Sequence, residues 1–179
     1  DPRNQDVKRL SERAMAALAI ARAQDSEDPD GLWEQTKQRA EDILAEADYL
    51  ERGKQLFHGA SYPLARQTFN EGMDWSDNPA VLRRWGYLAQ IGEDLPNDVF
   101  DKDVREQAVQ ALERLNEDKF DQAAERLETL AERASTASLT SAGVQALQAD
   151  CRLFRLLEES DQARADGAYG QVAEKIREA

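Results

Sequence analysis

Side chains able to do chemistry are scarce in this chain of 179 residues. His58 is its one histidine and Cys151 its one cysteine, so neither a two-histidine metal site nor an internal disulfide can form within one chain. His58 precedes the turn-like Gly59-Ala60, where a helix C-terminus favours histidine. Cys151 lies in an apolar run, which predicts a buried and inert thiol. Neither residue indicates catalysis.

One acidic segment resembles the start of a calcium loop. It reads Ser26-x-Asp28-x-Asp30-Gly31. The twelfth position of such a loop needs a bidentate glutamate, and here it is Lys37. Phosphate-binding glycine loops, Gly-x-Ser-x-Gly and Cys-x-x-Cys are absent from the sequence. We therefore predict no metal and no cofactor.

Neighbouring carboxylates such as Glu117-Asp118 and Glu158-Glu159 are frequent, as expected on the solvated faces of a chain with 36 acidic residues. A catalytic pair would need an apolar pocket that separates the two pKa values, and no stretch of the sequence indicates one. We predict that the protein is not an enzyme and has no catalytic residue.

The formal net charge is −13, and the basic residues are interleaved with acidic ones. This pattern disfavours binding to nucleic acid or to a membrane surface. Arginine outnumbers lysine, which is typical of GC-rich coding and suggests an acidic bacterial protein. No signal peptide or membrane span is recognisable. The chain begins without methionine, so we expect a fragment of a larger protein, cytoplasmic unless a targeting signal lies elsewhere.

The elements that would position a site show a repeated pattern: a large residue, a small one three later and a large one four beyond. Such residues share one face of a helix, and each copy follows helical sequence and a turn-like stretch. The pattern predicts helical hairpins. The copies are Tyr62-x-x-Ala65-x-x-x-Phe69, Phe120-x-x-Ala123-x-x-x-Leu127 and Tyr169-x-x-Val172-x-x-x-Ile176.

We predict an all-α fold, because helix formers dominate and strand-like alternation is absent. The chain would form one helical-repeat domain over 1–179, with N-terminal helices in 1–45, hairpins in 46–134 and a C-terminal hairpin in 135–179. The helix over 141–166 is either continuous or split near Ser160. The predicted helices are 5–23, 32–58, 62–73, 79–91, 103–116, 120–134, 141–166 and 169–178, with a loop over 92–101.

The segment Tyr49–Trp85 resembles a tetratricopeptide repeat, a pair of antiparallel helices of about 34 residues. Beyond it the spacing of the pattern is irregular. The resemblance implies an irregular stack of antiparallel hairpins, and a generic helical bundle is the alternative. The residues that carry the resemblance are Tyr49, Leu50, Gly53, Leu56 and Phe57 in the first helix, Tyr62, Ala65, Phe69 and Gly72 in the second, and then Pro79, Leu82, Trp85 and Gly86.

The resemblance implies a concave face that holds a segment or helix of another protein. Trp75, in a polar turn, is either an exposed binding residue or a plug between hairpins. We predict a non-catalytic protein–protein interaction scaffold, and the alternative is a dimerisation or spacer domain that forms a homodimer. The other candidate partner-binding residues are Lys54, His58, Arg83, Arg84, Tyr87 and Gln90.

Overall fold

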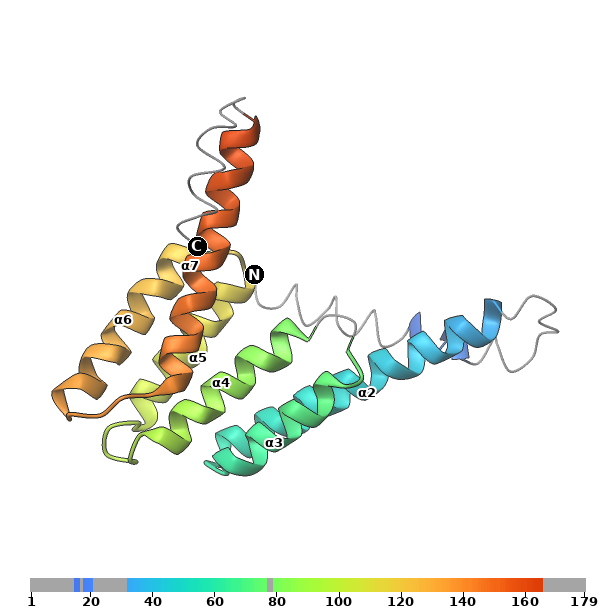
Figure 1. Cartoon of the computed structure of the whole chain (residues 1–179). Helices are drawn as coiled ribbons and strands as arrows, with labels where there is room; N and C mark the ends of the chain where they lie inside the picture. Colours follow the sequence, from blue (N-terminus) through green and yellow to red (C-terminus); the bar gives the residue numbers. More distant parts are fainter. Residues whose placement is uncertain (1–14, 17, 21–31, 77–78, 166–179) are drawn as a thin grey trace. The chain divides into compact units, whose positions relative to one another are not determined.

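The computed structural model describes residues 15–16, 18–20, 32–76 and 79–165, and within these ranges it is helical and contains no strand (Figure 1). The predicted all-α fold is therefore confirmed for the described part of the chain. The helices are α2 (Leu32–His58), α3 (Tyr62–Met73), α4 (Ala80–Asp94), α5 (Lys102–Asn116), α6 (Phe120–Thr136) and α7 (Ala142–Ala165).

The predicted bounds of α2 and α3 are confirmed at both ends, whereas α4 continues three residues past the predicted Ile91. The predicted loop over 92–101 is therefore shorter, and its buried Leu95 and Phe100 anchor it. The α7 helix is continuous through Ser160, so it is not split there. The predicted helix 169–178 and the third copy of the pattern lie outside the described residues.

The chain divides into two compact units, Asp1–Arg83 and Arg84–Ala179, and the boundary falls within α4. The prediction of one continuous domain over 1–179 stays a prediction.

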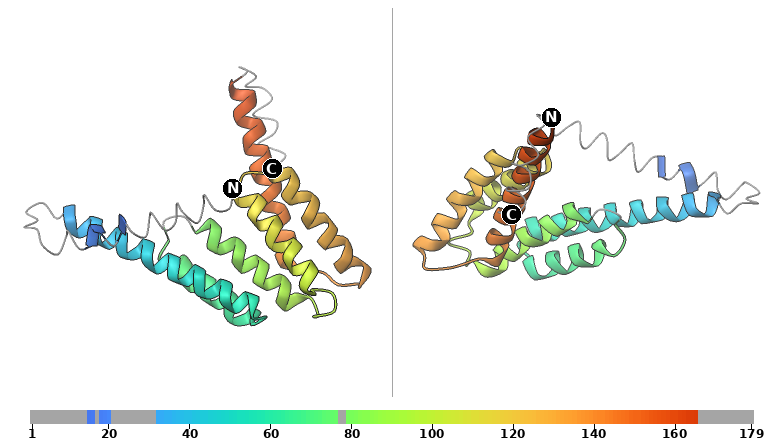
Figure 2. Two further views of the ribbon diagram at one scale, coloured as in Figure 1. Left: turned by 180° about the vertical axis from the view of Figure 1, so that it is seen from behind. Right: turned by 45° about the horizontal axis from the view of Figure 1, so that its top comes forward.

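The centre of the first unit is the hairpin of α2 and α3, which run side by side in every view (Figures 1 and 2). On α3 the predicted face is buried, with Tyr62, Ala65 and Phe69 all turned away from solvent. The helices approach so closely that a Cβ atom at Gly53 would overlap the ring of Phe69. Because Gly53 lacks that atom, the ring can lie directly against the backbone of α2.

The first two copies of the pattern are preceded by the same turn. Ala60 and Asp118 have φ angles of 57° and 59°, the left-handed conformation that commonly ends a helix. In each turn the left-handed residue lies two positions before the aromatic residue. It directs the N–H of the residue that follows it back towards the helix that has just ended. Ser61 N–H donates to the carbonyl of Leu56, and Lys119 N–H donates to that of Arg114, both at 2.9 Å. The two turns therefore share their backbone conformation and this hydrogen bond.

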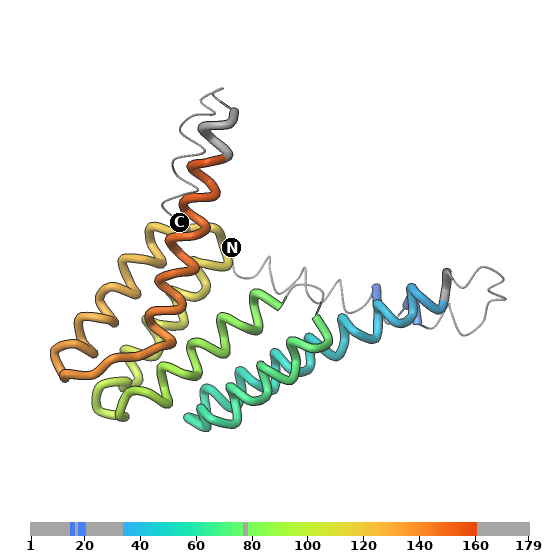
Figure 3. Tube along the Cα trace, viewed as in Figure 1, coloured from blue at the N-terminus to red at the C-terminus, as the bar shows by residue number. Residues whose placement is uncertain are grey.

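The second unit contains α5, α6 and α7 together with α4 from Arg84 onward (Figures 1 and 3). The α5 helix packs on α6, and α6 packs on α7. Phe120 at the start of α6 stacks on Phe154 of α7, with ring centroids 5.5 Å apart. Contacts between consecutive helices fit a series of hairpins and a generic helical bundle equally.

The α7 helix also packs against α4, which lies three helices earlier in the chain. At the crossing, a Cβ atom at Gly143 would overlap the carbonyl oxygen of Tyr87 and lie 2.8 Å from Ile91 Cγ1. Asp94 at the end of α4 accepts hydrogen bonds from the Ser141 hydroxyl at 2.8 Å and from Ala142 N–H at 3.0 Å, at the start of α7. The first and last helices of this unit thus meet, which a strictly linear series of helices would not require.

Candidate functional site

Arg84 joins three helices of the second unit through its side chain. Its Nε donates to Asp150 Oδ2 at 3.2 Å, and its Nη1 donates to Asn116 Oδ1 at 2.8 Å. The guanidinium carbon lies 4.8 Å from the centroid of the Phe154 ring, a cation–π geometry. One arginine on α4 therefore contacts the end of α5 and two turns of α7.

The prediction that Arg84 belongs to an exposed partner-binding surface is not compatible with this placement. Only 6% of the residue is exposed, because Asp150, Asn116 and Phe154 surround it. Arg83 is exposed, as predicted. Consecutive residues of a helix point about 100° apart, so two adjacent arginines can have different surroundings.

A signal for the burial of Arg84 is present in the sequence. Arg84, Leu88 and Ile91 are spaced by four and three residues, so they share one face of α4. The two apolar residues are fully buried. An arginine aligned with such a face requires a buried acceptor, and the sequence does not indicate which of 36 acidic residues supplies it.

Cys151 lies beside this network and is buried, as predicted, with 2% of its surface exposed. Burial raises the pKa of its thiol to about 11, with a further increase from the neighbouring Asp150 and an opposing effect from Arg84. The thiol is therefore protonated at neutral pH and lacks the thiolate that nucleophilic chemistry needs.

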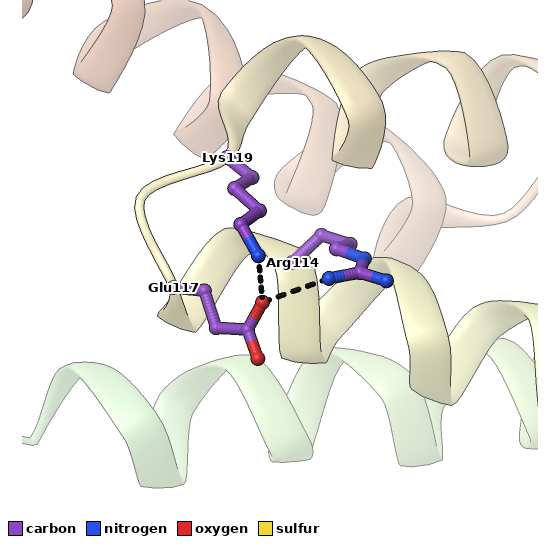
Figure 4. Close-up of polar contacts among 3 residues, drawn as sticks. All are labelled: Arg114, Glu117 and Lys119. Atoms are coloured by element: carbon purple, nitrogen blue, oxygen red, sulfur yellow. Dashed lines mark hydrogen bonds and ion pairs between the residues drawn. The ribbon is translucent and has the colours of Figure 1, made fainter. Parts of the chain in front are cut away.

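A second polar cluster is formed at the turn between α5 and α6 (Figure 4). Glu117 Oε2 accepts hydrogen bonds from Lys119 Nζ at 2.8 Å and from Arg114 Nη1 at 2.9 Å. The bond from Lys119 is the larger cause that lowers the pKa of Glu117 from its ordinary value of 4.5; the bond from Arg114 adds to it, and burial opposes both. Asp118 beside it is exposed. Within this carboxylate pair, Glu117 therefore stabilises the turn through its bonds to two cations.

The remaining predicted partner-binding residues belong to different units. Lys54, His58, Trp75 and Arg83 belong to the first, while Tyr87 and Gln90 belong to the second. His58 and Arg83 are exposed, and Lys54, Tyr87 and Gln90 are half-buried. Their grouping into one binding groove stays a prediction.

Large apolar side chains are exposed on α3 and just past its end. Trp75, just past the end of the helix, is 47% exposed, which favours a binding residue over a plug between hairpins. Leu64 is 56% exposed and was not predicted. The sequence signal for the exposure of Leu64 is its position next to Ala65, whose side chain is buried. Consecutive side chains of a helix point about 100° apart, so the side chain of Leu64 is directed away from the buried face.

Among the described residues, no group of three or more histidine, cysteine, aspartate or glutamate side chains is arranged to hold a metal ion. None of the described helices combines the length and the apolar character needed to cross a membrane.

Comparison of the chain with models of protein families, with curated proteins and with solved structures found no match.

Proposed function

We propose that this chain is a non-catalytic interaction module that binds a segment of another protein on the hairpin of α2 and α3. The observation that carries the proposal is the exposure of Leu64 on α3 and of Trp75 just past the end of this helix. Tryptophan is among the residue types that contribute most to protein–protein binding when a partner covers them. A tryptophan left half exposed in a polar turn is therefore a candidate anchor for a partner.

The hairpin is suited to this role because it is held rigidly. Phe69 is fully buried against Gly53, and a Cβ atom at Gly72 would lie 2.6 Å from Tyr49 Cβ. Such close packing fixes the outer surface before binding, so that little conformational entropy is lost when a partner docks.

The exposed apolar residues also define the spacing that a partner must match. Leu64 lies in the first turn of α3 and Trp75 lies two residues past the end of that helix at Met73, so nearly the whole length of α3 separates them. Between them, Gln67 Nε2 donates to Glu71 Oε1 at 2.8 Å, so the exposed surface of α3 between them includes a polar pair. We infer that the partner presents two apolar side chains separated by a polar stretch.

The resemblance to tetratricopeptide repeats would instead place the partner on the concave side formed by the first helices, near Lys54 and His58. The exposed apolar area favours α3, because apolar burial supplies most of the free energy of association. In this proposal Arg83 is an accessory contact for an acidic group of the partner.

The experiment is selection of binding peptides from a display library against the immobilised full chain. The selected peptides are then titrated against the double variant Leu64→Ala/Trp75→Ala. Loss of a binding anchor costs at least about 2 kcal/mol, so the affinity should fall by at least about thirtyfold. The thermal melt should change little, since both side chains are exposed.

The matched control is the double variant Leu153→Ala/Leu157→Ala on α7, which also removes two exposed apolar side chains but lies in the second unit. It should bind the same peptides with unchanged affinity. Peptides that bind both double variants and the parent equally would refute the placement on α3. A library that yields no specific peptide at all would count against a peptide-binding module.

The alternative is a dimerisation or spacer domain without a separate ligand. The observation that favours it is the exposure of Leu153 (46%) and Leu157 (48%), which lie one turn apart on α7. Light scattering coupled to size-exclusion chromatography separates the two proposals. A stable dimer that dissociates on Leu157→Glu would support the alternative, and a monomer at all concentrations would exclude it.

A further inference from the structure

We draw no further inference here: the strongest candidate, the exposed apolar flank of α7 formed by Leu153 and Leu157, carries nothing beyond the dimerisation alternative, because nothing in the described part of the chain shows what covers it.

Discussion

Replacing Arg84 with methionine should destabilise the second unit strongly, although the change keeps an apolar stem of similar length. The substitution removes the donors to Asp150 and Asn116 and the cation over Phe154. The Asp150 carboxylate, with 16% of its side chain exposed, would then be left without its arginine. The neighbouring Arg83 is exposed, so Arg83→Met provides a matched control.

The magnitude follows from the burial of the pair. Breaking a buried ion pair by removing one partner costs about 3–5 kcal/mol, because the other charge stays desolvated. Asp150 keeps some contact with water, which places the cost near the lower end, at about 3 kcal/mol. For a protein of this size, that loss corresponds to a decrease of roughly 10 °C in Tm. Arg83→Met should change the free energy of unfolding by less than about 0.5 kcal/mol.

The assay is urea unfolding of the full chain followed by circular dichroism, with a double-mutant cycle. Asp150→Leu alone should cost at least about 3 kcal/mol, because it leaves the Arg84 charge, which is more buried than Asp150, without its carboxylate. The double variant Arg84→Met/Asp150→Leu should lose about 1–3 kcal/mol less than the sum of the single losses, since it leaves neither charge behind.

Two results would refute this reasoning. One is an Arg84→Met variant that unfolds at the same urea concentration as Arg83→Met, which would mean that Arg84 is exposed in solution. The other is strict additivity of the single losses in the double variant, which would mean that Arg84 and Asp150 do not interact.

Three further predictions concern the turns and seams. Gly53→Ala should destabilise the first unit by about 1–3 kcal/mol, because the new methyl group would overlap the ring of Phe69. Gly59→Ala should cost less in the same thermal melt, because its Cβ atom would overlap no atom and would lie 3.3 Å and 3.5 Å from the carbonyl oxygens of Gln55 and Leu56. Ala60→Gly should raise the free energy of unfolding by about 0.5–1 kcal/mol, since it removes the strain of a left-handed alanine; a decrease in stability would contradict the assigned φ angle. Glu117→Gln should destabilise the chain at neutral pH but not in acid, because folding lowers the pKa of Glu117. The contribution of the Glu117 carboxylate to the free energy of unfolding is therefore present above pH 4.5 and is lost as the pH falls through the lowered pKa. A difference between parent and Glu117→Gln urea midpoints that stays constant from about pH 7 to about pH 3 would exclude this ion-pair contribution.

The helices could be predicted from local sequence because their determinants are local. The face made by Tyr62, Ala65 and Phe69 is buried as its spacing predicts, and Phe120 and Ala123 repeat it in the second unit. The bounds of α2 and α3 were confirmed because a turn separates two strongly periodic segments. The end of α4 was placed three residues early, since Gly92 was interpreted as a stop and is instead a buried residue within the helix.

The candidate site was less accessible to prediction. Trp75, in a polar turn, was interpreted as either an exposed binding residue or a plug between hairpins, and the structure leaves it half exposed. Arg84 was assigned to the same surface because it flanks Trp85 in the sequence, and that position does not indicate whether the side chain has a buried acceptor. That acceptor is Asp150, 66 residues further along the chain.

The sequence alone therefore determined that the described chain is helical, which face of each hairpin is apolar and where two of the turns lie, because these depend on interactions within a few residues. Only the tertiary structure decided that α7 lies on α4, that Arg84 is buried while Arg83 is exposed, and that Leu64 is left uncovered. The periodicity of an apolar helix face predicts that another element covers it. The same periodicity results whichever helix provides that cover. The choice of partner depends on contacts between distant residues, such as Gly143 with Tyr87, that no local pattern records.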